Sequence, residues 1–235
     1  MKAPIRIVTP LVAASAALAL TAGTASAATT TVREETATGA PYSGNWQVTT
    51  VGTLDFAVTF LGSRVTGSCE DATLQGTVES TGAGELTAAS LGACQTSNGL
   101  SSPATDLDLS EMPDRSGSVA YDPVPDGRDG VLTIGAGLNF KIEGQVLGFT
   151  VTCYYGFQTG GAPGLAFDIY NRDNPNRPLP AHDDAQGAAD DITLVRQPGS
   201  SALCPSNGTG SGAAIARGES VPGSGVYDRK LYVTS

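Results

Sequence analysis

The sequence predicts an all-β protein, an antiparallel β-sandwich (immunoglobulin-like or jelly-roll-like) stapled by two disulfides. Three observations predict it. Short segments alternate apolar and polar residues, glycine and proline interrupt the chain throughout, and four cysteines follow the N-terminal segment. The 30 glycines and 14 prolines leave little room for long helices, because each costs a helix interior about 1 and about 3 kcal/mol respectively.

Alternation with a period of two is typical of strands that bury one face. Leu54, Phe56 and Val58 fall on one side of such a segment, and Val151 and Cys153 fall on one side of another. Glycine-rich and aspartate-rich turns separate the segments, as in an antiparallel sandwich or barrel, and the alternating strand–helix order of a parallel sheet is missing. We expect strands at 45–51, 53–61, 64–69, 72–80, 84–92, 105–109, 117–122, 130–135, 138–143, 145–155, 164–170, 191–196, 212–217 and 230–234.

The four cysteines predict two disulfides, because an even number in an exported chain forms cross-links. Three pairings are possible, and pairing between sequence neighbours predicts Cys69–Cys94 and Cys153–Cys204. A cysteine metal site is disfavoured, since zinc ligands are usually closely paired and supported by histidine. We expect no metal and no cofactor.

Residues 1–27 have the order of a secretory signal: a basic start, an apolar stretch and a small-residue cleavage pattern. We expect export by the general secretory route, with cleavage near Ala27/Ala28, and no membrane insertion. Residues 28–44 are expected to form a flexible N-terminal arm or an added strand, and 45–235 a single β-sandwich domain. The polar, proline-rich segment 171–189 is expected to be a long exposed loop.

The charge excludes several partners. The chain has 13 Lys and Arg against 23 Asp and Glu, and loss of Lys2 and Arg6 with the signal leaves a formal charge of −12. Such a chain lacks the basic face that nucleic acids or anionic lipids require. It favours a partner with a basic surface.

Candidate catalytic and metal sites are weak. The one histidine, His182, lies in a loop beside Asp183 and Asp184, and no nucleophile elbow of the G-x-S-x-G type accompanies it. Paired acids could serve in a hydrolase, but the sugar-stacking aromatics usual beside such acids are missing here. Asp122–Asp129 and Asp168–Asn176 hold oxygen ligands that could take Ca²⁺, although turns use the same residues.

Residues 67–78 (GSCEDATLQGTV), followed by 84–90 (GELTAAS) and Met112-Pro113, carry a family resemblance. The segment resembles small secreted actinobacterial β proteins described as activators of alkane oxidation. This resemblance spans residues 45–155, implies a secreted β protein and carries over no catalytic residue. By size, acidity and fold, adaptor subunits of secreted toxin assemblies are also comparable.

The sequence therefore favours a secreted, non-enzymatic adaptor that contributes to an extracellular protein assembly, such as a toxin complex. The alternatives are a small-ligand carrier with an apolar cleft and a secreted hydrolase built on Asp and Glu. The expected partner is another secreted protein. The residues predicted to contact it, from the arm and the loop, are Arg33, Glu34, Glu35, Tyr42, Asp173, His182, Asp183 and Asp184.

Overall fold

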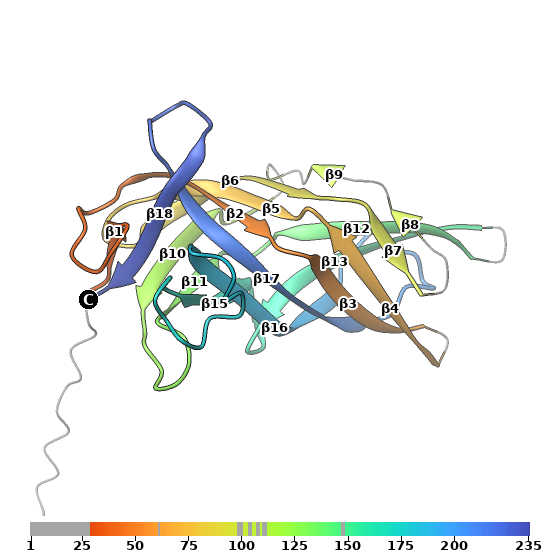
Figure 1. The fold of residues 1–235 in the computed structure, drawn as a ribbon. Helices are drawn as coiled ribbons and strands as arrows, with labels where there is room; N and C mark the ends of the chain where they lie inside the picture. Colours follow the sequence, from red (N-terminus) through yellow and green to blue (C-terminus); the bar gives the residue numbers. More distant parts are fainter. Residues whose placement is uncertain are drawn as a thin grey trace, which may run out of the picture.

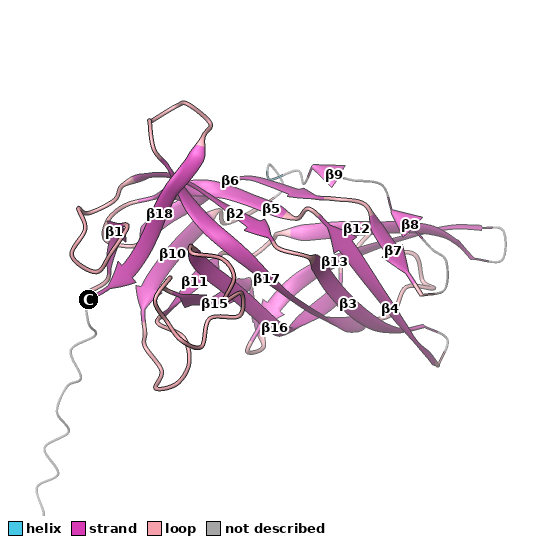
Figure 2. Ribbon diagram, viewed as in Figure 1, coloured by secondary structure: helices cyan, strands magenta, loops and turns pink. Residues whose placement is uncertain are grey.

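A computed structural model describes residues 29–60, 62–97, 101–102, 105–106, 109, 112–146 and 149–235. These residues form β-strands joined by turns, with no α-helix, so the all-β prediction is confirmed (Figure 2). The strands are β1 (Thr31–Glu34), β2 (Gly44–Thr50), β3 (Thr53–Phe60), β4 (Ser63–Glu70), β5 (Thr73–Val78), β6 (Ala83–Leu91), β7 (Cys94–Thr96), β8 (Ser101–Ser102), β9 (Thr105–Asp106), β10 (Ser116–Tyr121), β11 (Gly130–Ile134), β12 (Asn139–Val146), β13 (Phe149–Thr159), β14 (Ala162–Pro163), β15 (Leu165–Tyr170), β16 (Ala185–Arg196), β17 (Asn207–Glu219) and β18 (Tyr227–Thr234).

The predicted sandwich is wrong, because eight antiparallel strands pair in a closed circuit and form a barrel. The circuit runs β2–β5–β6–β10–β11–β15–β16–β17 and returns to β2. A sandwich would leave edges on two separate sheets. Here the β6–β10 pairing, with Glu85 opposite Ser116, and the β17–β2 pairing, with Gly218 opposite Trp46, remove those edges.

Two of the barrel strands extend beyond the barrel and support a second lobe (Figure 1). The first part of β17 pairs with β3, which continues through β4 and β7 to β8. The last part of β16 pairs with β13, which pairs with β12. A register shift between Ala189 and Ile192 in β16 lies where the barrel gives way to the second lobe.

Each lobe has its own hydrophobic core. Trp46, Leu86 and Ile134 belong to the barrel core. The second core contains Phe56, Tyr155, Leu194 and all four cysteines. Phe157 packs against both cores, so the two lobes share a continuous apolar interior.

Both predicted disulfides are confirmed: Cys69 is bonded to Cys94, and Cys153 to Cys204. Both lie in the second lobe, and Cys69 and Cys94 are opposite each other on β4 and β7. These cross-links are compatible with an extracellular protein.

The N-terminal segment and the loop before β16 are both attached to the barrel. β1 pairs with β18, Val32 and Leu231 join the barrel core, and Val233 is also buried. The loop predicted for 171–189 ends earlier than expected, because β16 begins at Ala185. The Gln186 side chain forms three hydrogen bonds with that loop. Its Oε1 accepts from Leu179 N, and its Nε2 donates to the carbonyls of Leu179 and His182, at 2.7 to 2.9 Å.

The predicted signal, residues 1–27, lies outside the described residues. Within the described part of the chain, no helix is long and apolar enough to cross a membrane.

Candidate functional site

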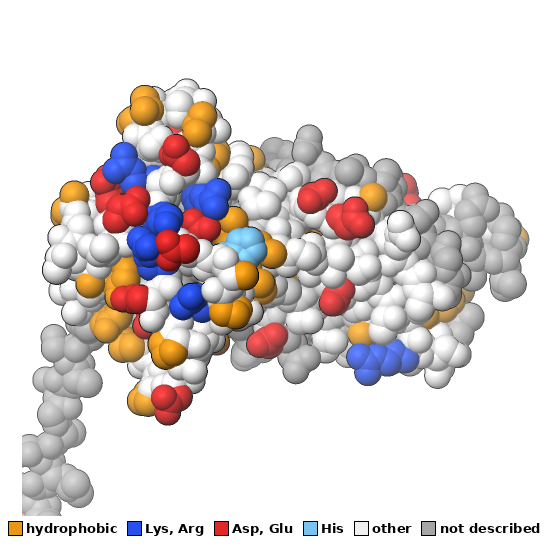
Figure 3. All heavy atoms as spheres, in the orientation of Figure 1, with side chains coloured by type: hydrophobic (Ala, Val, Ile, Leu, Met, Phe, Trp, Pro, Cys, Tyr) orange, Lys and Arg blue, Asp and Glu red, His pale blue; other side chains and the backbone are white. Residues whose placement is uncertain are grey.

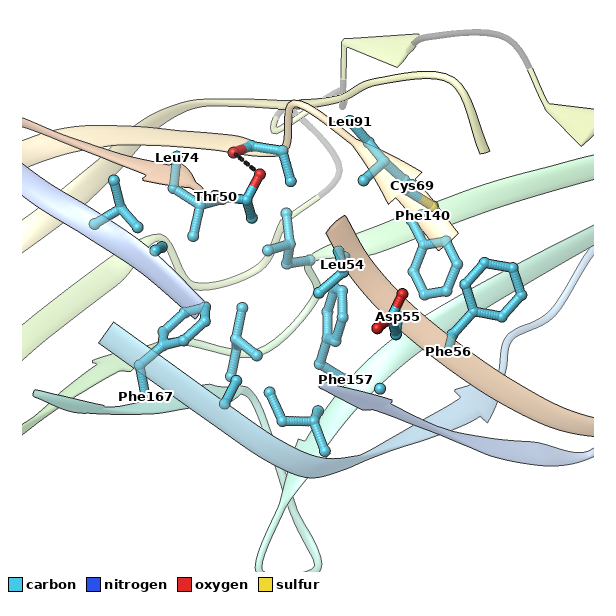
Figure 4. A pocket seen from close by; sticks show the side chains of 18 of the residues that line it. Thr50, Leu54, Asp55, Phe56, Cys69, Leu74, Leu91, Phe140, Phe157 and Phe167 are labelled. Atoms are coloured by element: carbon cyan, nitrogen blue, oxygen red, sulfur yellow. Dashed lines mark hydrogen bonds between the residues drawn. The ribbon is translucent and has the colours of Figure 1, made fainter. Parts of the chain in front are cut away.

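An apolar cavity of about 80 Å³ lies where the barrel meets the second lobe (Figure 4). Residues of both lobes line it: Val48 and Phe167 come from barrel strands, and Leu54 and Phe140 from the second lobe. The cavity therefore exists only because β16 and β17 carry both lobes on the same two strands.

Small residues on β16 and β17 leave this space open. Ala189, Gly210 and Ala214 line the cavity from these strands. A Cβ added at Gly210 would be 3.7 Å from its nearest neighbours, an ordinary contact distance. The hollow therefore results from side chains that are too short to fill the space between the two strands and the aromatic rings opposite.

Large aromatic side chains form much of the opposite wall. The Phe140 ring lies 5.5 Å from the Phe157 ring, and it stacks on Tyr155 with 5.7 Å between centroids. Tyr155 is buried, and burial raises the pKa of its phenol to about 12. Its hydroxyl donates to the Pro205 carbonyl at 3.3 Å, so the polar end of this ring is satisfied.

The cavity has few polar groups. Asp55 is the one ionisable side chain among its lining residues, and it belongs to an exposed position of β3. The Thr50 hydroxyl already donates to the Ala72 carbonyl at 3.3 Å (Figure 4). The lining therefore fits a molecule without charge and with little hydrogen-bonding capacity.

A second apolar cavity of about 60 Å³ lies inside the barrel, between Trp46, Leu132, Ala185 and Ala216. Val48 lines both cavities. The two spaces therefore share a wall, and their volumes together come to about 140 Å³. Apolar cavities of about 150 Å³ stay dry and take up benzene or xenon.

The residues predicted to bind a partner lie around β18. Arg33 is opposite Tyr232 in the β1–β18 pairing, and the Tyr232 hydroxyl donates to Asp173 at 3.3 Å. Lys230 donates to Asp183 at 2.7 Å, and this bond is the main cause of a lowered pKa of Asp183. The arm and the loop, distant in sequence, therefore meet on one face, where Figure 3 shows charged side chains gathered.

Most acids of that face are paired. Arg172 contacts Asp183 at 2.6 Å and Glu35 at 3.7 Å. Glu34 is paired with Arg229 at 2.6 Å, and the buried Asp184 accepts two hydrogen bonds from Arg217 at 2.9 and 3.0 Å. The face is therefore a network of opposite charges.

Two predicted contact residues have structural partners. Tyr42 is 4% exposed in the barrel core, and its hydroxyl accepts from Glu219 N at 2.8 Å. The His182 amide donates to Leu179 O at 2.9 Å, and its carbonyl accepts from Gln186. Their roles in binding stay predictions.

The two candidate Ca²⁺ segments lie side by side and are linked by Arg128, which donates to Asp122 and to Asp168 at 2.5 and 3.1 Å. Asp129 accepts from Asn171 N and from Asn174 Nδ2 at 2.7 and 2.9 Å. No group of three or more His, Cys, Asp or Glu side chains suited to a metal is found in the described part of the chain.

The sequence led us to expect an apolar cleft only for the carrier alternative, and no residue of this cavity was assigned to it. The signal that could have pointed to it is the small-residue alternation of β17, where Gly210, Gly212, Ala214 and Ala216 recur at every second position. On one face of such a strand, every side chain is too small to fill the space beside it. Read from sequence alone, this pattern resembles a glycine-rich loop.

Comparison of the chain with protein-family models, with curated proteins and with solved structures found no match.

Proposed function

We propose that this is a non-enzymatic binding protein that carries a small apolar molecule in the cavity between its lobes. One observation carries the proposal: the cavity is apolar, is lined by both lobes and lies against a second apolar cavity that shares Val48. An eight-stranded barrel is wide enough either to be filled by side chains or to hold one small ligand. The small residues on β16 and β17 favour the second case.

The expected ligand is an uncharged hydrocarbon of about the size of benzene. The two cavities together nearly reach the volume of a site that binds benzene or xenon, but Val48 lies between them. A benzene-sized ligand would therefore have to displace Val48 and extend into the barrel. Secretion through residues 1–27 belongs to the same proposal, and the two disulfides support it.

Benzene and xenon are suitable probes, because both fit apolar cavities without any polar contact. We expect the thermal midpoint of the purified protein to rise in benzene-saturated buffer, since a ligand that binds only the folded state stabilises it. We also expect xenon to shift NMR signals of methyl groups around Val48. No response to either probe would contradict the proposal.

Three variants test the location. Ala214→Leu places a larger side chain in the cavity and should weaken benzene binding at least tenfold. Val48→Ala removes the shared wall and should strengthen binding several-fold. Ala213→Leu is the matched control, because Ala213 is the neighbour of Ala214 and points to the other face of β17. Native mass spectrometry of the protein from culture medium would then identify a retained natural ligand.

An adaptor role is a second candidate. It is favoured by the meeting of the arm and the loop on one face around β18. Because the acids there are already paired with arginine and lysine, the partner surface it fits would also carry mixed charges. Asp183→Lys should then abolish co-purification with a secreted partner, and unchanged recovery would count against this role.

A further inference from the structure

The outer face of β7, β4, β3 and β17 forms an open polar groove of about 590 Å³. Asp55 and Phe56 of β3 line both this groove and the apolar cavity, and the other ten residues that line the groove do not line the cavity. Its volume is within the range of about 300–1,000 Å³ that is usual for small-molecule sites.

The polar side chains of the groove are arranged in two rows across the strands. In the first row Gln95 is opposite Ser68, Ser68 opposite Asp55, and Asp55 opposite Ser211. In the second row Thr66 and Thr209 flank Ala57, and Ser97 is bonded to Thr66 through both its amide and its hydroxyl.

This arrangement repeats at the spacing of the strands, about 4.8 Å. That distance is close to the length of one sugar residue in an extended glycan. A glycan that crosses the strands would thus meet a similar set of polar groups at each residue.

Several of these side chains have free hydrogen-bonding capacity. Within the described part of the chain, the side chains of Arg64, Ser68, Gln95, Thr209 and Ser211 make no hydrogen bond or ion pair. Asp55 accepts one hydrogen bond, from the Thr53 hydroxyl at 3.0 Å. The groove therefore offers both donors and acceptors, as a polyhydroxylated ligand requires.

The charge of the groove favours an uncharged ligand. The chain has 36 charged residues, 13 basic and 23 acidic, but only Asp55 and Arg64 line the groove, and they carry opposite charges. Figure 3 shows charged side chains gathered around β18, whereas the face over β3 and β4 is mostly free of them.

We propose that this groove binds a neutral oligosaccharide laid across β7, β4, β3 and β17. The groove binds and does not cleave, because glycoside hydrolysis requires two carboxyl groups flanking the bond and Asp55 is the one carboxylate among the residues that line it. Exposed aromatic platforms are missing from the lining, so the affinity comes from hydrogen bonds and is expected to be weak.

The test is a titration of the whole purified protein with cellohexaose, xylohexaose, maltoheptaose and chitohexaose, followed by NMR. We expect at least one of them to shift backbone amides of β3, β4 and β17 with a millimolar or lower Kd. Oligogalacturonate tests the charge argument, and stronger binding of this acidic glycan than of every neutral one would overturn the proposal. The absence of any shift at 10 mM would overturn it too.

The double variant Ser68→Ala/Gln95→Ala should weaken binding at least fivefold. Thr87→Ala, on an exposed position of barrel strand β6, is the matched control and should bind as the parent does. Equal binding by the double variant and the parent would contradict the assignment. Ala214→Leu should leave oligosaccharide binding unchanged, which separates this site from the apolar cavity.

Discussion

The Phe56 ring lies directly over Gly67, its partner in the β3–β4 pairing. A Cβ added at Gly67 would come within 2.2 Å of the Phe56 Cζ atom. Glycine at this position therefore lets an aromatic ring cover the strand, and the ring closes one side of the apolar cavity.

Gly67→Ala is expected to destabilise the protein by about 1–3 kcal/mol, as overpacking of a well-filled site does. The Phe56 ring has to move, because the new methyl group would overlap it. Chemical denaturation measures the loss. The control is Gly117→Ala, where the nearest atom to an added Cβ is 3.5 Å away, and an equal loss in both variants would contradict this account.

Asn171→Ala is expected to cost about 2–4 kcal/mol. The Asn171 side chain is buried and donates to Val233 O at 2.9 Å while it accepts from Val233 N at 2.8 Å. Its removal leaves two buried backbone groups without partners, each at about 1–3 kcal/mol. Urea unfolding would show the loss. Asn176→Ala, at an exposed position of the same loop, should change stability by less than about 0.5 kcal/mol.

Glu219 makes stability depend on pH. Its carboxylate accepts from Gly225 N and Gly223 N and, with a smaller effect, from Asn45 and Ser224, and these hydrogen bonds lower its pKa. A lowered folded-state pKa means that the stabilisation is complete above the pKa of the unfolded chain. It is lost as the pH falls through the folded-state value.

Glu219→Gln should therefore lower the thermal midpoint at pH 7, and the difference from the parent should shrink as the pH falls below 4. Thermal melts between pH 7 and pH 3 measure this convergence. Glu79→Gln, at a turn between β5 and β6, serves as a control with a carboxylate outside this network. If the difference in thermal midpoint between the variant and the parent stays constant from pH 7 to pH 3, the Glu219 charge does not contribute to stability.

The two disulfides should contribute unequally. Cys153–Cys204 spans 51 residues and Cys69–Cys94 spans 25. Each disulfide is expected to contribute about 2–4 kcal/mol to the free energy of unfolding. In the chain-entropy model, doubling the length of the loop that the disulfide closes adds about 0.6 kcal/mol. Paired Cys→Ala variants, compared by denaturation, should therefore lose more at Cys153 and Cys204. The reverse order would indicate that packing around the cysteines outweighs loop entropy.

Most strands could be predicted because their signal is local. The expected strand at 53–61 is close to β3 (Thr53–Phe60), and the one at 64–69 is close to β4 (Ser63–Glu70). The first half of β16 was missed, since Ala185–Ala189 contains Ala, Gln and Gly, which have low strand propensity. These small residues form a strand because the two neighbouring strands, β15 and β17, both pair with them.

The sequence by itself determined the strand content, the apolar face of each strand and the disulfide partners, because alternation and spacing are properties of short segments. Only the tertiary structure decided that the sheet closes into a barrel, and that two of its strands continue into a second lobe. Closure depends on pairs such as Trp46 with Gly218, which lie far apart in the chain. A half-buried strand has the same pattern in a sandwich and in a barrel, so the cavity and the groove became visible only when the partners of each strand were known.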